Sequence, residues 1–365
     1  MAQVFASPGR YIQGYGEMER IGGHVKGYGT SFQVLASPNG LKRFGKLIAN
    51  CLKEAGYKVH MEEFRGECTK EEAHRLADLA KEKECDSIIG VGGGKVMDTA
   101  KGVAYYGGYS NVIVPTIAAS DAPTSALSVF YREDGVLDEV IMFEKNPEVV
   151  LVDTKVIAEA PVRLLIAGMG DALATYFEAR GCVEGYKDNF AGGTFTKASY
   201  ALAELCYQAL LENGKLAVEA VKKKRVTKAV NDVIEANTLL SGIGFESNGV
   251  TGAHSIYYGF TVIPEHLNMY HGEFVAFGTI VLLLLENRSR KELERVIEFC
   301  LEVGLPVCFE DLHMGEMTPE KLQAVAKKAL DPLETIHNEP FKVSEDELIG
   351  ALLVADSLGH SYKEK

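Results

Sequence analysis

Short apolar runs alternate with helical patterns in the first part of the chain. The runs predict strands at 32–36, 57–61, 87–91, 112–115 and 149–152. Hydrophobic positions three and four residues apart predict helices at 41–55, 70–84 and 96–105. Strands that alternate with helices form crossover units, so we predict a parallel sheet with helices on both faces.

Residues 125–131 and 139–143, which precede the last of these strands, flank a turn at 132–135 and predict a hairpin. The pattern changes after the last strand. Long helical patterns then follow at these positions: 161–180, 195–213, 216–224, 226–242 and 291–303. We therefore predict two domains, an α/β domain of residues 1–160 and an all-α domain of residues 161–365.

The chain is acidic, with 38 Lys and Arg against 51 Asp and Glu, a formal net charge of −13. Nucleic acids and anionic membranes attract basic surfaces, so neither is expected as a partner. The longest apolar run, 274–285, is shorter than the roughly 20 residues of a membrane span, and no signal-peptide pattern is visible. Seven scattered cysteines without a CxxC pair favour reduced thiols in a cytoplasmic protein over disulfides.

The most informative local feature is a glycine turn, Gly92-Gly93-Gly94-Lys95, between a buried strand and a helix. Glycines let a ligand approach the backbone, and the N–H groups of a helix N-terminus favour a phosphate. The turn fits neither GxGxxG nor the P-loop, so it predicts a diphosphate cradle of another type; a turn without a ligand is the alternative. After the next strand, loop 116–125 is rich in hydroxyl side chains, which can bind phosphate or ribose.

Two histidines and one aspartate have unusual surroundings. His254 lies among small residues, and His271 begins the most hydrophobic helical pattern. Asp171 lies in an otherwise apolar helix, where an ionised carboxylate needs a partner. One carboxylate and two neutral imidazoles that leave a coordination position open are typical of a catalytic Zn²⁺ or Fe²⁺ site. The sequence separations alone cannot show that the three residues meet.

Three motifs together carry a resemblance to a known family. They are the glycine turn followed by Asp98, PTIAASDAPTSALSV at 115–129, and HGEFVAFG at 271–278. With them, the chain resembles the iron- or zinc-dependent (group III) alcohol dehydrogenases, and among these the members that oxidise glycerol. The resemblance implies a dehydroquinate synthase-like fold, with a Rossmann-like dinucleotide-binding domain before a helical metal- and substrate-binding domain.

The resemblance also implies the cofactors and the residues that bind them. NAD and one divalent metal are expected, with Zn²⁺ favoured over Fe²⁺. The metal ligands would be Asp171, His254 and His271, while Asp121 and Phe245 would face the substrate and Asp121 would join the ligands in catalysis. The residues expected to bind NAD are Gly92, Gly93, Gly94, Lys95, Asp98, Thr116, Ser125, Leu127, Val129 and Tyr131. A homo-octamer is expected from the same resemblance.

Two departures from the family pattern concern specificity. Ser37 stands where many members have an Asp that binds the adenosine ribose, which removes a repulsion against the 2′-phosphate of NADP. We still expect NAD. Tyr257 stands where the glycerol-oxidising members carry a further His near the substrate, so metal binding is expected to survive while the preferred alcohol can differ.

Three functions remain open from the sequence. The first is metal-dependent, NAD-linked oxidation of glycerol or a similar vicinal diol to the hydroxyketone. The second keeps the fold and the cofactor but acts on a 2-hydroxy acid and its keto acid, or on another small alcohol. The third is an NAD-binding protein without catalysis, which would require a broken metal site, yet all three ligand positions are intact.

Overall fold

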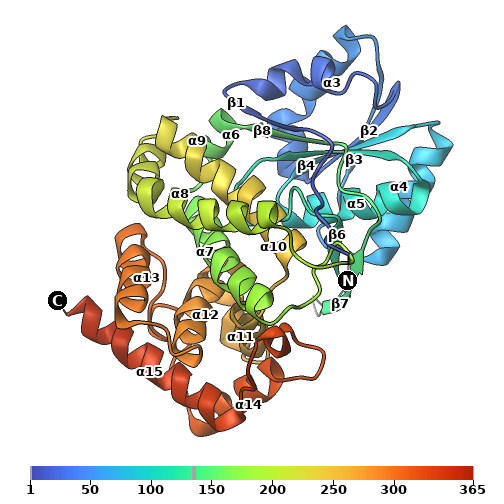
Figure 1. Ribbon diagram of the computed structural model, residues 1–365. Helices are drawn as coiled ribbons and strands as arrows, with labels where there is room; N and C mark the ends of the chain where they lie inside the picture. The colour runs from blue at the N-terminus through green and yellow to red at the C-terminus, as the bar shows by residue number, and fades with distance from the viewer. Residues whose placement is uncertain (1, 134–136, 365) are drawn as a thin grey trace.

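The computed structural model describes residues 2–133 and 137–364, which form an α/β body beside a helical body (Figure 1). In the α/β body, six described strands form one sheet in the order β1-β8-β5-β4-β2-β3, with every neighbouring pair parallel. The strands are β1 (Tyr11–Gly14), β2 (Ser31–Ala36), β3 (Lys58–Glu63), β4 (Ser87–Gly92), β5 (Ser110–Pro115) and β8 (Val149–Asp153). The predicted parallel sheet is confirmed, and β1 is an additional edge strand.

Helices cover both faces of the sheet because its central strands are apolar on both sides. Every residue of β2, β4 and β8 is buried, as expected for a sheet enclosed between two layers. Helices α1 (Ile21–His24) and α3 (Lys46–Glu54) bury their apolar residues against one face. Helices α4 (Lys70–Glu82) and α5 (Gly94–Gly107) cover the other, whose core continues into the helical body.

The predicted hairpin is present as an antiparallel pair, β6 (Leu127–Tyr131) and β7 (Leu137–Met142). Its predicted turn includes Asp134 and Gly135, which lie outside the described residues. The pairing carries a register shift between Phe130 and Tyr131. Strand β6 also lies against α5, so the hairpin is attached to the helix that follows the glycine turn.

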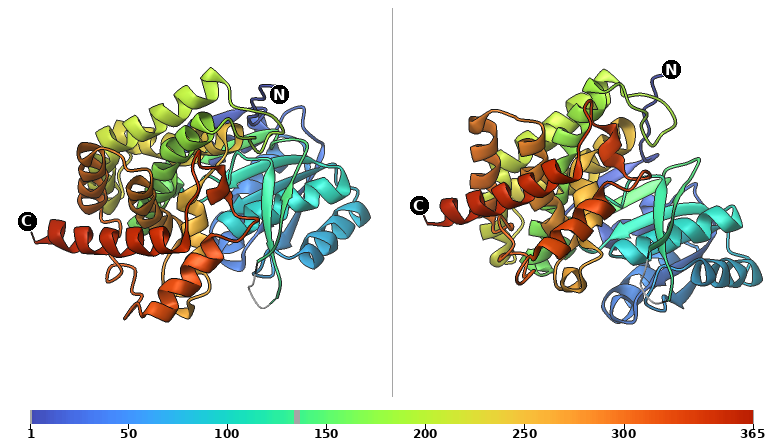
Figure 2. Two further views of the ribbon diagram at one scale, coloured as in Figure 1. Left: turned by 60° about the horizontal axis from the view of Figure 1, so that its bottom comes forward. Right: turned by 90° about the horizontal axis from the view of Figure 1, so that it is seen from below.

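The helical body contains long helices that pack on one another (Figure 2). Its α-helices, with α6 leading into them, are α6 (Thr154–Glu159), α7 (Val162–Glu184), α8 (Lys197–Lys222), α9 (Lys228–Glu235), α10 (Ser241–Asn248), α11 (Gly252–Phe260), α12 (His271–Leu285), α13 (Arg290–Val303), α14 (Pro319–Ala329) and α15 (Glu345–Lys363). None of the helices in the described part of the chain is long and apolar enough to cross a membrane.

Two helix predictions were wrong in their limits. The two helices expected at 195–213 and 216–224 are the single helix α8, which runs through Gly214. A Cβ at Gly214 would lie 2.8 Å from a ring carbon of Phe299 in α13, so the glycine serves packing rather than a break. The single helix expected at 226–242 is divided into α9 and α10 by a π-helical turn at Ala236–Leu240.

One apolar core crosses from the sheet into the helical body. It includes Ile113 of β5, Leu173 of α7 and Phe274 of α12, all fully or almost fully buried. The N-terminal segment also joins the two bodies, since Gln3 pairs with Thr194 and the Val4 carbonyl accepts the Asn189 side-chain N–H at 2.9 Å. The orientation of the two bodies is therefore fixed by extensive packing.

Candidate metal centre and cofactor site

The carboxyl ends of three neighbouring strands bring the predicted cofactor residues to one edge of the sheet. The register pairs Gly92 of β4 with Pro115 of β5, and Ala36 of β2 with Val91 of β4. The Thr116 N–H donates to the Gly92 carbonyl at 2.9 Å and links the glycine turn to the hydroxyl-rich loop. Strand order reverses between β2 and β4, which is where open α/β sheets bind ligands.

The three consecutive glycines serve two different needs. A Cβ on Gly92 would lie 2.8 Å from side-chain carbons of Val96, including its Cβ, so this position is glycine for packing. A Cβ on Gly93 would lie 2.9 Å from Cδ1 of Ile117, which is the movable end of that side chain. A Cβ on Gly94 would meet nothing within 4 Å. Gly94 is the first residue of α5, where backbone N–H groups are free, so the open space beside it fits a diphosphate.

Two of the predicted cofactor residues are held by the protein itself. The Lys95 ammonium lies 2.6 Å from a carboxylate oxygen of Glu67. Asp98 is buried; its Oδ2 accepts the Val129 N–H at 3.2 Å, and its Oδ1 lies 3.0 Å from the ammonium of Lys101. Asp98 therefore anchors β6 to α5.

The remaining predicted cofactor residues lie on the loop after β5 and on one face of β6. Ser125 is buried and the others are half-buried, namely Thr116, Leu127, Val129 and Tyr131. Burial, and then the charges of Tyr257 and Tyr258, raise the pKa of Tyr131. The half-buried face of β6 thus lies near α11, which carries both of these tyrosines and His254.

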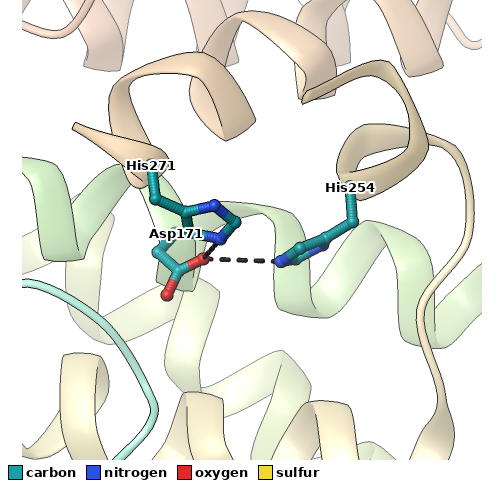
Figure 3. Close-up of side chains that lie close together, drawn as sticks. All are labelled: Asp171, His254 and His271. Atoms are coloured by element: carbon teal, nitrogen blue, oxygen red, sulfur yellow. Dashed lines mark ion pairs between the residues drawn. The ribbon is translucent and has the colours of Figure 1, made fainter. Parts of the chain in front are cut away.

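Asp171, His254 and His271 meet although they come from three different helices (Figure 3). The Nε2 atom of His271 lies 3.1 Å from Asp171 Oδ1, and that of His254 lies 3.5 Å from the same oxygen. One ligand atom from each residue falls within 4.8 Å of the other two. Asp171 is 1% exposed, whereas the side chain of His271 is 34% exposed, so the group is buried on one side and accessible on the other.

The electrostatics of this group suit a cation. Asp171 Oδ1 is buried and accepts no well-directed hydrogen bond within the described residues, although both imidazoles point at it. Burial opposes the charge of Asp171, but His271 and then His254 hold the pKa of its carboxyl below the usual value. Burial likewise lowers the pKa of His254, but Glu178 and Asp171 outweigh it and raise that pKa well above its usual value. Three donors that converge without satisfying one another fit a divalent metal with an open position.

Glu178, which lies behind His254, was not among the predicted site residues. Its carboxylate oxygen Oε2 is 2.6 Å from Nδ1 of His254, and its side chain is fully buried. A signal for it was present, because Glu178 follows Asp171 by seven residues and so lies two turns along the same face of an otherwise apolar helix.

The predicted substrate residues are placed differently from one another. The Asp121 N–H donates to Asp171 Oδ2 at 3.2 Å, and its own Oδ2 accepts the Ser241 hydroxyl at 3.0 Å. Burial and then the charge of Asp171 raise the pKa of Asp121 well above its usual value. Phe245 is buried on α10 and its ring packs edge-on against Phe190, with 5.9 Å between ring centroids.

Tyr257, the departure from the family pattern, packs on a metal-ligand candidate. Its ring meets that of His271 edge to face, with 4.3 Å between the centroids and 87° between the planes. The aromatic contact holds the imidazole in place on its half-exposed side. This is consistent with a metal centre that tolerates a tyrosine at this position.

A parallel sheet with a glycine turn at its strand ends, beside three converging side chains that could hold a metal, is the arrangement expected of a metal-dependent oxidoreductase with a dinucleotide cofactor. Comparisons with known proteins agree. The model of the family described as iron-containing alcohol dehydrogenase matches residues 8–154. The chain is 45% identical to the glycerol dehydrogenase of Citrobacter freundii, over 99% of both chains, and 42% identical to the glycolaldehyde reductase of Halobacterium salinarum over the whole of both. The crystal structure of glycerol dehydrogenase from Schizosaccharomyces pombe superposes with a TM-score of 0.96, at 36% identity, covering 100% of this chain and 92% of that one.

The chain belongs to the iron-containing alcohol dehydrogenase family, and it is an NAD-dependent alcohol dehydrogenase. The resemblance predicted from the motifs is thereby confirmed, as is the dehydroquinate synthase-like fold. The NAD and divalent-metal predictions are supported at the level of the family.

Proposed function

We propose that the protein oxidises glycerol or a similar vicinal diol to the corresponding hydroxyketone. The observation that carries this proposal is the position of Asp121, a second carboxylate directly beside the three-ligand group. A diol has two adjacent hydroxyl groups, and a site with one open metal position and one neighbouring carboxyl can bind both. The glycerol dehydrogenases that the chain resembles support this choice.

Each of the proposed site residues has a separate role. When bound, the metal polarises a substrate hydroxyl as a Lewis acid, and NAD supplies the hydride acceptor. Asp171, His254 and His271 would hold the metal. Asp121, which lies beside Asp171, would hydrogen-bond the second hydroxyl, while the Ser241 hydroxyl fixes its orientation. Phe245 would bound the pocket with an apolar wall.

The cofactor would lie along the strand ends. Gly94 and the start of α5 would bind the diphosphate, with Gly92 and Gly93 shaping the turn and Lys95 adding a positive charge. Asp98 would act through β6, which it anchors. The residues proposed to line the rest of the site are Thr116, Ser125, Leu127, Val129 and Tyr131. Held there, the nicotinamide would face the substrate carbon beside the metal.

Zn²⁺ is the metal we propose, in preference to Fe²⁺. Two imidazoles and one carboxylate with one position open are a ligand set that both ions accept. Hydride transfer changes the oxidation state of the substrate and of NAD only, so the metal needs no redox chemistry. Metal content of the purified protein, and reconstitution of the chelator-treated protein with each ion, test this choice.

Reduction of small hydroxyaldehydes is the second candidate, favoured by the glycolaldehyde reductase relative. A hydroxyaldehyde offers the same adjacent pair of oxygen atoms as a diol. A 2-hydroxy acid would instead need a cation for its carboxylate. Lys101 is a cation whose charge acts on Asp121. Its ammonium is already bound by Asp98 and by the carbonyls of Ala122 and Leu127, so it is not available to a substrate carboxylate.

A panel of substrates tests the proposal, with turnover measured as the change in nicotinamide absorbance. Glycerol, 1,2-propanediol and 2-hydroxybutyrate are assayed with NAD and NADP, and dihydroxyacetone and glycolaldehyde with the reduced forms NADH and NADPH, before and after chelation. We expect the highest kcat/KM for a vicinal diol with NAD, loss of turnover on chelation and recovery with Zn²⁺. A preference for 2-hydroxybutyrate, or full activity after exhaustive metal removal, would refute it.

We also propose a cytoplasmic homo-oligomer, with eight subunits as the expected number. All seven cysteines are unpaired, which suits a reducing compartment. Leu353 and Val354 on α15 are each 48% exposed, an apolar surface that fits a subunit contact. The division of the chain after residue 160 is part of the same proposal. Light scattering of the purified protein measures the subunit number.

A further inference from the structure

Glu178 binds His254 from two sides at once. Its Oε2 lies 2.6 Å from Nδ1 of the imidazole. Its Oε1 accepts the backbone N–H of His254 at 3.1 Å and that of Thr251 at 3.0 Å. The side chain is fully buried, so water does not compete for these bonds. Both the main chain and the ring of His254 are therefore fixed by one carboxylate.

We propose that Glu178 is a positioning residue that makes His254 a metal ligand through Nε2. A neutral imidazole carries its proton on one nitrogen and offers the other as a ligand. A carboxylate can only accept, so Glu178 holds the proton on Nδ1 and leaves the lone pair of Nε2 free. That Nε2 is the atom that faces Asp171 Oδ1 (Figure 3). The inference rests on the metal site of the proposed function and goes beyond it by adding a residue outside the ligand set.

The same carboxylate also caps α11. Thr251 is the N-cap residue of this helix, but its own side chain makes no capping hydrogen bond. A negative charge at a helix N-terminus is stabilised by the free N–H groups and the helix dipole. Glu178 thus fixes the first turn of the helix that carries His254, relative to α7, which carries Asp171. Any test must separate this capping from the orientation of the ring.

Glu178→Gln separates the two roles. Its amide oxygen can still accept both backbone N–H groups, so the cap is retained. Its NH₂ group then faces Nδ1 and can only donate, which places the imidazole proton on Nε2 and blocks the ligand atom. We expect metal affinity, measured by competition with a chromophoric chelator, to fall by about 10- to 100-fold. The metal-free variant should remain folded, and the visible spectrum of the Co²⁺-loaded protein should change.

Glu246→Gln is the matched control. Like Glu178, Glu246 is buried and accepts hydrogen bonds from the backbone and from a side chain. Its donors are the Ala126 N–H at 2.8 Å and the Asn146 side-chain N–H at 2.6 Å. Neither partner belongs to the metal-ligand group. We expect Glu246→Gln to leave Zn²⁺ affinity and the Co²⁺ spectrum as in the wild type.

A double-mutant cycle with His254→Ala decides whether Glu178 acts through His254. If it does, Glu178→Gln weakens metal binding in the wild type but not in the His254→Ala background. A general loss of structure would weaken both backgrounds equally, and that result would overturn the inference, as would wild-type affinity in Glu178→Gln. Because the readout is metal affinity, a protein that binds metal but does not oxidise diols would contradict the proposed substrate alone.

Discussion

Substituting alanine for Gly272 tests whether close helix packing sets the geometry of the metal centre. Gly272 is the second residue of α12 and directly follows His271. A Cβ built on it would lie 2.9 Å from both the carbonyl carbon of Ala167 and the backbone nitrogen of Asp171, and nearer still to the Ala167 oxygen. All of these atoms belong to the backbone of α7, so no side chain can rotate away to relieve the contact.

The structure gives the size of the effect. Ordinary carbon contacts lie at about 3.5–4.0 Å, so α7 and α12 must separate by on the order of 1 Å to accept the methyl group. Overpacking of this kind costs about 1–3 kcal/mol of stability. The shift moves Asp171 relative to His271, which lie on the two helices concerned. Since a misplacement of about 1 Å can cost about 100-fold in rate, we expect a comparable loss of kcat with diol and NAD.

The assay combines three measurements on purified Gly272→Ala, namely thermal unfolding of the metal-free protein, Zn²⁺ affinity and kcat. Gly350→Ala is the control, because it lies inside α15 and a Cβ there meets nothing within 4 Å. Alanine is favoured over glycine within helices by up to about 1 kcal/mol, so the control should be slightly stabilised. If Gly272→Ala had the Tm, Zn²⁺ affinity and kcat of the wild type, the argument that this contact positions the ligands would be wrong.

Three further predictions follow from the cofactor site and from the buried charges. Gly94→Ala should raise KM for NAD by about 10-fold without lowering the Tm of the free protein, because its methyl group fills the space proposed for the ligand. Gly92→Ala should lower that Tm, because its methyl group meets the Val96 side chain. Equal Tm losses in the two variants would contradict this assignment. Ser37→Asp should lower kcat/KM for NADP by at least about 10-fold and that for NAD much less, because a carboxylate at the end of β2 repels a 2′-phosphate; an unchanged cofactor ratio would place the ribose elsewhere. Burial, and then the charges of Glu286 and Glu178, raise the pKa of Glu339 from 4.5 to about 7, although Thr251 acts in the opposite direction. The contribution of this one carboxyl to stability is therefore lost as the pH rises from about 4.5 to 7. Glu339→Gln should abolish this loss of about 3 kcal/mol. Urea unfolding should then show that the variant is more stable than the wild type at pH 8 but not at acid pH. A gain in stability that does not depend on pH would refute the assignment.

The α/β body could be predicted from the sequence because its signals are local. Apolar runs such as 87–91 are as long as a strand, and capping residues such as Thr69 mark where helices begin. The strand β1 was missed because Tyr11–Gly14 is short and only half-buried, and its pairing with β8 joins segments far apart in the chain. Long-range pairing of this kind leaves no periodic signal.

The candidate metal ligands could be chosen from the sequence, but their meeting in one site could not be predicted from it. His254 stood out among small residues, yet its helix α11 was missed because Gly252–Phe260 combines glycines with aromatic residues of modest helix propensity. Glu178 was missed because its partner lies 76 positions away. Its position on the same helix face as Asp171 was a weak signal, because an isolated glutamate in a helix is normally on the surface. The packing of α11 on α7 shows that this glutamate is buried.

Helix α7 explains why these particular residues occur together. Gly168 and Gly170 lack the Cβ atoms that would strike the backbone of Ala118 and of Gly272, so the hydroxyl-rich loop and α12 both come against the helix. The next residue is Asp171, whose carboxylate is reached by groups from both neighbours, the Asp121 N–H and the His271 imidazole. Two turns further along α7, Glu178 fixes α11, the helix that carries the remaining candidate ligand, His254. The small residues around Asp171 are thus the reason that the hydroxyl-rich loop and α12 can both reach one carboxylate, with the Asp121 N–H at Oδ2 and the His271 imidazole at Oδ1.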